Sequence, residues 1–330
     1  MMHAVSRESE NSFFPISPLM IMPDTLGDFA IYIKRDNGLH ALYCGKDSIF
    51  TKQHMERLHD NGVQEIYIET SEKTNFESYA KQHLGKILNN ETIPIKDRGR
   101  VFLDTSKTIV RSAFKEKLPS SGERHDEFFK ELYELVTNSL DFLCIEDVIK
   151  GFGQLMSTDY ETYTHCIHVF VFSSAILRNQ YEKDILTRIG MGALLHDIGK
   201  TLIPKSILLK PDKLTDDEFA EIKKHPLNGV TFCTNASLSQ EAYNIILYHH
   251  EKLDGSGYPS GLRGDRIPDY VRAVTISDIY DALISNRAYA DAMKPFEALR
   301  LMQEVFLKAG QVDGDLFKRF VAMLAGNREL

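Results

Sequence analysis

The stretch HDIGK, residues 196–200, follows an apolar run at residues 185–195 whose hydrophobic positions recur at helical spacing. His196 and Asp197 are therefore predicted near the last turn of a helix, which Gly199 ends. Adjacent helical residues diverge by about 100°, because the helical period is 3.6 residues. One residue of the pair can then bind one metal ion while the other faces a second. An ordinary helix end can also carry a His-Asp pair without any metal.

Length and composition are typical of a globular protein with room for two domains. The 330 residues are 43% hydrophobic and have a formal charge of −8, with no basic block that would follow a phosphate backbone. The four cysteines form no CxxC pair, so neither a disulfide framework nor a zinc ribbon is expected. No signal-peptide pattern is present, and no apolar run approaches the ~18 residues that span a bilayer. We expect a cytoplasmic protein without a DNA partner or a membrane segment.

The first part of the chain, residues 1–91, predicts a small regulatory α/β domain. Strands are expected at residues 29–33, 39–43 and 64–68. Helices are expected at residues 51–58, after a Thr cap, and at about residues 76–88. The turn signal Asp36-Asn37-Gly38 joins the first two strands. This part has no cluster of metal-ligating residues and no glycine-rich phosphate loop, so sensing or docking is expected here rather than catalysis.

Residues 92–122 are predicted to be a helical linker. An amphipathic helix from about residue 99 to residue 117 precedes a break at Pro119-Ser120-Ser121-Gly122. The helix either carries a signal or forms part of a dimer interface, and both roles stay open. Residues 123–330 have helical period in nearly every long segment and no predicted hairpin, so the second domain is expected to be all-α. The predicted fold class is a two-domain α+β chain.

Imidazoles and carboxylates recur along the second domain at positions predicted to be helical. Glu161 and His165 are four residues apart, so they share one helix face. The complete set is Glu161, His165, His196, Asp197, His225, His249, His250 and Asp278. Such a set, without a thiolate pair, suits Fe, Mn, Co, Ni or Zn better than Ca or Mg. Eight residues are too many for one metal, so two or three metals are expected, with Asp197 or Glu161 bridging.

The same segments carry five motifs in chain order. They are DYETYTHCIHV at 159–169, LLHDIGKTLIPKSILLKPDKLTDDEF at 194–219, HPLNG at 225–229, HHEKLDGSGYPSGLRGDRIP at 249–268 and SDIYDALISNRAY at 277–289. Together they make the chain resemble the HD-GYP family of the HD phosphohydrolase superfamily, enzymes that hydrolyse cyclic di-GMP. The resemblance covers about residues 159–287 and implies an HD-type helical bundle for the second domain.

The resemblance also implies a role for individual residues. It implies a first metal site made by His165, His196, Asp197 and Asp278. It implies a second site completed by His225, His249 and His250, with Glu161 as the extra carboxylate of members that hold three metals. Asp197 and Lys200 would be catalytic, Lys200 by stabilising charge on a phosphate. The substrate pocket would be lined by Lys200, Gly257, Tyr258, Pro259 and Arg287.

Two further polar residues on the same predicted helices are expected to have supporting roles. His168 lies three residues after His165 and could reach a metal, but the family pattern implies a packing role for this position. Asp281 lies three residues after Asp278, on a neighbouring face, so we expect it to support a ligand or to cap a turn.

The implied activity is metal-dependent hydrolysis of cyclic di-GMP to linear pGpG, GMP or both by a metal-bridging hydroxide. The cofactors would be two or three divalent or trivalent ions, with Fe as first choice and Mn as alternative. An alternative is a catalytically weak cyclic di-GMP receptor, because the chain has Ala288 and Ala290 where many members have Pro and Arg. A third reading, hydrolysis of ordinary nucleotides, does not explain His249-His250 together with the GYP signature, Gly257-Tyr258-Pro259, in the loop that follows them. A homodimer or a signalling partner would use the N-terminal domain or the linker helix.

Overall fold

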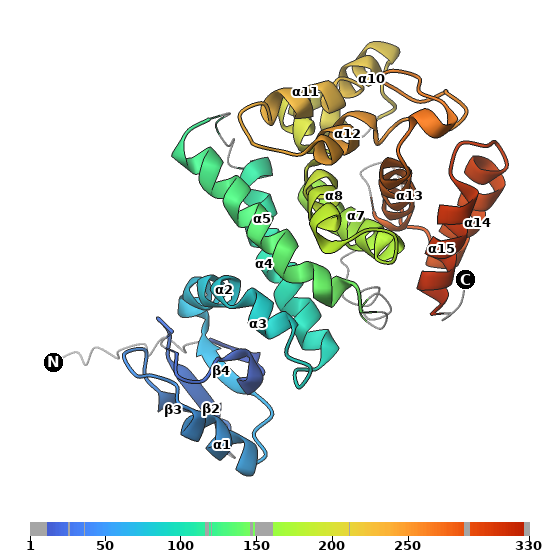
Figure 1. Cartoon of the computed structure of the whole chain (residues 1–330). Helices are drawn as coiled ribbons and strands as arrows, with labels where there is room; N and C mark the ends of the chain where they lie inside the picture. The colour runs from blue at the N-terminus through green and yellow to red at the C-terminus, as the bar shows by residue number, and fades with distance from the viewer. Residues whose placement is uncertain are drawn as a thin grey trace. The chain divides into compact units, whose positions relative to one another are not determined.

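The computed structural model describes residues 12–25, 27–35, 37–115, 119, 121–145, 148, 161–210, 212–286 and 291–326. The chain divides into two compact units, Met1–Val101 and Phe102–Leu330 (Figure 1). The division falls inside one helix, α4 (Ile95–Lys115), which starts four residues before the predicted position. The contacts thus mark one division point, and the separate linker at residues 92–122 stays a prediction.

A four-stranded antiparallel sheet forms the centre of the first unit. Its strands are β1 (Phe13–Ile16), β2 (Ile31–Lys34), β3 (His40–Cys44) and β4 (Ile66–Glu69). Their order in the sheet is β1-β4-β2-β3. Ile66 and Ile68 alternate with more exposed residues along β4 and are fully buried, as a strand with one covered face requires. Strand β1 was not predicted, because Pro15 weakens the strand signal and is tolerated only at a sheet edge.

The first unit also contains α1 (Lys52–Asp60), α2 (Lys73–Gln82), α3 (Leu84–Leu88) and the start of α4 up to Val101. The predicted Thr cap is confirmed, since the Thr51 hydroxyl accepts a hydrogen bond from the His54 amide and His54 Nδ1 accepts one from the Thr51 amide. The single helix predicted at residues 76–88 is wrong in one respect, because the chain leaves helical geometry at His83. Phe76 on α2 packs edge-on against Phe29, so α2 contributes to the core of this unit.

The secondary structure described for the second unit is helical apart from isolated bridge positions, such as the pair Asp254 and Arg263, which confirms the all-α prediction. Its helices are α5 (Glu123–Leu143), α7 (Thr162–Leu177), α8 (Lys183–Leu195), α9 (Lys205–Leu208), α10 (Asp216–Ile222), α11 (His225–Phe232), α12 (Gln240–Tyr248), α13 (Asp269–Ile284), α14 (Pro295–Leu301) and α15 (Gly314–Ala325). The unit also contains a 3-10 turn, η3 (Ile198–Leu202), and a π-helical turn, η5 (Met302–Leu307). Helix α7 is the core helix: every residue from 164 to 177 is buried, and α8 and α13 pack against it (Figure 1). None of the described helices combines the length and the apolar character that crossing a bilayer demands.

The HDIGK stretch follows α8 directly and packs closely against α11. Helix α8 ends at Leu195, so His196 caps it, and Asp197 begins the turn η3. Gly199 therefore does not end the helix as predicted. Its role is a close approach to α11, because a Cβ atom at this position would lie 2.0 Å from the carbonyl oxygen of His225. This contact brings Asp197 next to the first residue of α11.

Candidate metal centre

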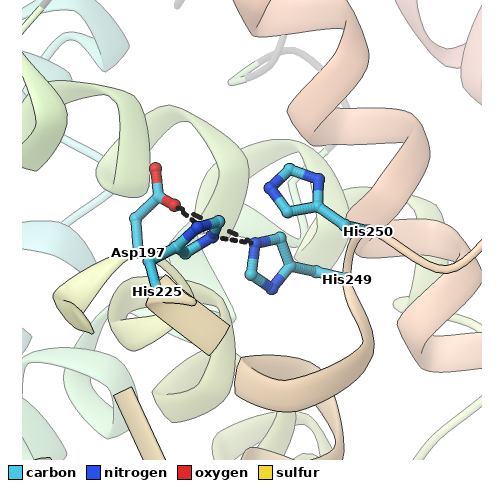
Figure 2. Close-up of side chains that lie close together, drawn as sticks. All are labelled: Asp197, His225, His249 and His250. Carbon is cyan, nitrogen blue, oxygen red and sulfur yellow. Dashed lines mark hydrogen bonds and ion pairs between the residues drawn. The ribbon is translucent and has the colours of Figure 1, made fainter. Parts of the chain in front are cut away.

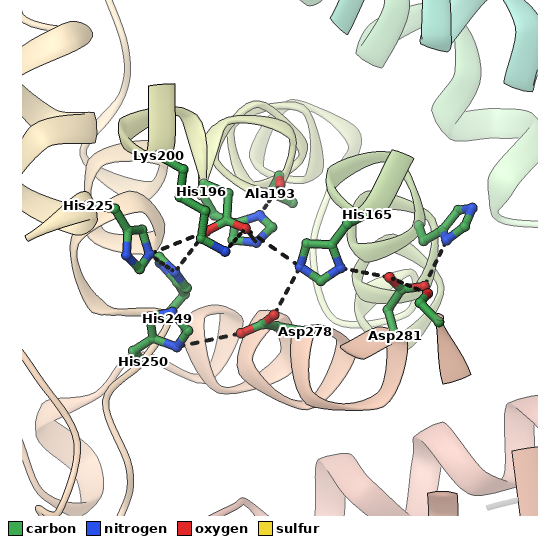
Figure 3. Close-up of polar contacts among 12 residues, drawn as sticks. His165, Ala193, His196, Lys200, His225, His249, His250, Asp278 and Asp281 are labelled. Atoms are coloured by element: carbon green, nitrogen blue, oxygen red, sulfur yellow. Dashed lines mark hydrogen bonds and ion pairs between the residues drawn. The ribbon is translucent and has the colours of Figure 1, made fainter. Parts of the chain in front are cut away.

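Seven of the eight predicted ligands gather in two neighbouring sets. The first set is Asp197, His225, His249 and His250, and the second is His165, His196 and Asp278. Within each set, one ligand atom of every residue lies within 4.8 Å of the others (Figures 2 and 3). They come from α7, the α8–η3 junction, α11, the end of α12, and α13, so helix packing rather than sequence proximity brings them together.

Three of the histidines have a protonation pattern set by the backbone. His196 Nδ1 donates to the Ala193 carbonyl at 2.8 Å, and His225 Nδ1 donates to the Ile222 carbonyl at 2.8 Å. His249 Nδ1 donates to the Ile245 and Ile246 carbonyls, each at 3.1 Å. A carbonyl oxygen can only accept, so Nδ1 carries the proton and Nε2 presents a lone pair in each ring.

These lone pairs meet other acceptors inside the centre. The Nε2 atoms of His225 and His249 are 3.1 Å apart, and Asp197 Oδ1 lies 3.3 Å from His225 Nε2. His196 Nε2 and Asp197 Oδ1 are buried and have no hydrogen-bond partner among the described residues. Buried acceptors that face one another repel and lose hydration, and a shared cation removes both costs. The residues present therefore fit a metal ion.

Asp197, a member of the first set, also faces the second. Its Oδ1 faces the first set, 3.3 Å from His225 Nε2 and 3.9 Å from His249 Nε2. Its Oδ2 faces the second, 3.5 Å from His196 Nε2 and 3.8 Å from His165 Nε2. Asp197 thus offers one carboxylate oxygen to each group of imidazoles, and its role as a bridging ligand stays a prediction.

Burial and charge keep the centre ready for cations near neutral pH. Burial lowers the pKa of His225 and of His249 to about 4 and holds the pKa of His250 well below its ordinary value. Burial opposes ionisation of Asp197, but Lys200, whose Nζ donates to Asp197 Oδ2 at 2.6 Å, and the nearby histidines keep its pKa well below the usual range. Neutral imidazoles and an ionised carboxylate can bind a metal without first losing protons.

Asp278 connects the second set to His250. Its Oδ1 lies 3.0 Å from His165 Nε2, and its Oδ2 lies 3.6 Å from His250 Nδ1. Tyr258 of the GYP loop packs on His250 with ring centroids 4.7 Å apart. Gly257 also has to be glycine, because a Cβ atom there would lie 2.5 Å from the His250 carbonyl oxygen. The GYP loop thus borders the metal centre directly.

One of the predicted metal ligands lies apart from these sets. Glu161 is the N-cap residue of α7, one turn before His165, and belongs to neither set. Its predicted place at a third metal therefore stays a prediction. Arg287, Ala288 and Ala290 lie outside the described residues. Pro259 follows Tyr258 within the described loop, and its predicted pocket role likewise stays a prediction.

Sequence reasoning missed three residues beside the centre. Glu251 is buried, and its carboxylate accepts hydrogen bonds from the amides of Ser260 at 2.6 Å and Leu262 at 2.9 Å, which ties the two ends of the GYP loop. Lys223 places its ammonium 5.5 Å from the Tyr258 ring centroid.

Cys166 is the third, within 4.8 Å of ligand atoms of His196 and Asp197. Burial raises the pKa of its thiol well above the ordinary value, so the thiol is protonated in the metal-free protein. Periodicity indicated none of the three roles, because each depends on a tertiary contact.

Comparison with known proteins gives a consistent result. The model of the HD domain family matches residues 162–316. A cyclic di-GMP phosphodiesterase of Pseudomonas aeruginosa is 30% identical over 281 residues, which are 81% of this chain and 66% of that protein. A cyclic di-GMP phosphodiesterase of Thermotoga maritima is 32% identical over 262 residues, 74% of this chain and 69% of that protein. The chain thus spans about two thirds of the length of these two relatives.

The fold agrees with a solved structure. An HDG"Y"P protein from Bdellovibrio bacteriovorus superposes with a TM-score of 0.63 and 20% identity, covering 95% of this chain and all of that one. This likeness confirms the predicted architecture of a small N-terminal α/β domain followed by an HD-type helical bundle. With the sequence relatives and the intact GYP signature at residues 257–259, it leads to one conclusion. The chain belongs to the HD-GYP family of the HD phosphohydrolase superfamily.

Proposed function

We propose that this protein is a metal-dependent phosphodiesterase that hydrolyses cyclic di-GMP to linear pGpG, GMP or both. The observation that carries the proposal is the convergence of buried imidazole lone pairs on Asp197, each Nε2 atom being freed by a proton fixed on Nδ1. The printed names of the Pseudomonas and Thermotoga relatives support the substrate. Regulation by the N-terminal domain belongs to the proposal, because that part of the chain carries none of the metal-centre residues.

The chemistry that bound cations supply in such a centre is Lewis acidity towards a phosphate oxygen and a lowered pKa of bound water. We assign two ions to the two sets, with iron first and manganese second, because imidazoles mixed with carboxylates suit these metals. Asp197 would contribute one oxygen to each ion, Oδ1 beside His225 and Oδ2 beside His196. A third ion near Glu161 remains part of the proposal, resting on its position one turn before His165.

Lys200 and Tyr258 provide the contacts to the substrate. The Lys200 side chain is 18% exposed, so its ammonium reaches both Asp197 and the solvent-facing side of the centre. There it stabilises negative charge that develops on a phosphate during bond cleavage. Tyr258 packs on His250, and the Lys223 ammonium lies over the Tyr258 ring. An aromatic face and a second ammonium group are therefore available to the substrate beside His250.

A cyclic di-GMP receptor with weak turnover is the alternative within the same family, because Ala288 and Ala290 depart from the common pattern. One experiment separates the two functions. Protein purified without oxygen is analysed for metal per chain and incubated with cyclic di-GMP, with pGpG and GMP followed over time. Turnover that depends on the metal supports the phosphodiesterase, whereas tight binding without product by fully loaded protein favours the receptor. A cyclic dinucleotide with one guanine and one adenine, tested in parallel, measures base specificity.

A further inference from the structure

Asp281 lies behind His165, on the side away from the metal centre (Figure 3). It is completely buried on α13, and each of its oxygens accepts a hydrogen bond from an imidazole of α7. Oδ2 accepts from His165 Nδ1 at 2.7 Å, and Oδ1 accepts from His168 Nδ1 at 2.7 Å. The Ser285 hydroxyl donates to Oδ2 at the longer distance of 3.4 Å. One buried carboxylate thus holds two histidines.

His165 needs such a partner because of its place in the helix. His196 and His249 cap α8 and α12, where the last carbonyls of each helix have no intrahelical donor and can accept from Nδ1. His165 instead lies within α7, whose backbone carbonyls are engaged in the helix. A side-chain acceptor on another helix therefore replaces the backbone carbonyl. Asp281 is that acceptor.

The contact determines which nitrogen of His165 faces the centre with a lone pair. An ionised carboxylate can only accept, so His165 Nδ1 carries a proton. His165 Nε2 lies 3.0 Å from Asp278 Oδ1, also a carboxylate oxygen, so without a metal this nitrogen can donate as well; a cation bound there would replace the Nε2 proton and use its lone pair. Loss of Asp281 would let the proton move to Nε2, the atom that has to bind the metal.

His168 contributes by holding Asp281. Its side chain is buried, and its Nε2 has no hydrogen-bond partner among the described residues, so the bond to Asp281 is the polar contact that the structure shows for this ring. A residue needed only for packing would be apolar here, since burying an unsatisfied polar atom costs free energy. The packing role expected for His168 therefore has to be extended by a hydrogen bond that orients the carboxylate.

We propose that Asp281 and His168 are positioning residues of the metal centre, in which Asp281 sets the tautomer and ring orientation of His165 and His168 holds the Asp281 carboxylate. The proposal rests on the proposed metal-dependent function. It differs from a purely structural role, in which the same bonds would only fasten α7 to α13. A positioning role changes metal affinity at unchanged fold, whereas a fastening role changes stability alone.

The test uses full-length, metal-free protein and two readouts. Nitrogen-15 NMR of the histidine rings reports the tautomer of His165, assigned by comparison with His165→Gln, and a chelator competition measures Mn²⁺ affinity. Asp281→Ala should populate the Nε2-protonated form of His165 and weaken Mn²⁺ binding about 10- to 100-fold. Asp281→Asn retains a neutral acceptor, so its Mn²⁺ affinity should lie between that of Asp281→Ala and that of the wild type. Asp269→Ala is the matched control on α13, where the carboxylate accepts from the Tyr181 hydroxyl instead, and it should change neither readout.

His168 supplies an independent pair of variants if Asp281→Ala fails to fold. His168→Phe removes the donor to Asp281 and should weaken Mn²⁺ binding, while His168→Asn keeps an N–H near the Nδ1 position and should restore most of the affinity. Wild-type tautomer and wild-type Mn²⁺ affinity in Asp281→Ala, or in His168→Phe, would overturn the proposal. If the wild type bound no metal, the proposed function would fail, and the tautomer of His165 in Asp281→Ala would still decide this inference.

Discussion

Substituting Gly199 by Ala should damage the metal centre without touching any ligand. A Cβ atom at this position would lie 2.0 Å from the His225 carbonyl oxygen and 2.4 Å from the Gly229 amide nitrogen. Both are backbone atoms of α11, so no side chain can rotate away. Ordinary van der Waals contact begins at 3.4 Å, and η3 and α11 would therefore have to separate by about 1.4 Å.

That separation acts directly on the ligands. Asp197 precedes η3 and His225 begins α11, with 3.3 Å between Asp197 Oδ1 and His225 Nε2. Metal–ligand distances tolerate changes of only about 0.2 Å, so a shift several times larger should remove the shared position. Overpacking of this kind also destabilises a fold by about 1–3 kcal/mol. Gly199→Ala should therefore lose metal at a modest cost in stability.

The assay combines Mn²⁺ titration of the metal-free protein with urea unfolding. Gly314→Ala is the control, because its new methyl group would meet only Leu307 Cδ1 at 3.5 Å and Gly314 begins α15. This control should be neutral or slightly stabilising, by up to about 1 kcal/mol, since alanine favours the helix. Wild-type Mn²⁺ affinity in folded Gly199→Ala would show that η3 and α11 can move apart without consequence, which would refute the reasoning.

Three more predictions concern the site. Asp197→Ala should lower the metal content and abolish hydrolysis of cyclic di-GMP while cooperative unfolding survives, because both sets lose their shared oxygens; near-normal turnover in the folded variant would disprove this. Glu251→Gln turns one acceptor of a backbone amide into a donor, so the loop around Tyr258 should loosen and KM should rise at unchanged metal content; an unchanged KM would contradict this. In metal-free protein, His225 and His249 have a pKa of about 4 against an ordinary 6.5, so the unfolded chain binds more protons between these values. Stability should be full above about pH 6.5 and fall towards about pH 4 by up to about 1.4 kcal/mol per pH unit for each imidazole, and flat urea midpoints across this range would argue against neutral buried rings.

Local features of the chain were predictable because their causes are local. Hydrophobic period located a helix at residues 185–195, within the observed α8 at Lys183–Leu195, and identified the helical second domain. Thr51 predicted the start of α1, since a cap involves residues three positions apart. The motif spacing identified seven residues that the structure brings into two sets, although their roles as ligands stay predictions. The short edge strand β1 was not predicted, because a four-residue strand with a proline has almost no periodic signal.

Tertiary structure alone decided which atoms of these residues face one another. His165 and Asp281 are 116 positions apart, so no local pattern connects them, yet their hydrogen bond selects the metal-facing nitrogen. The Glu251 carboxylate accepts a hydrogen bond from the Ser260 amide in the GYP loop, and Gly199 allows η3 to touch α11. Neither backbone contact can be predicted from the residue types alone. Sequence by itself determined which chemical groups are available and which helices carry them. Their protonation and orientation follow from long-range packing, because a buried imidazole takes the tautomer that its nearest fixed acceptor imposes.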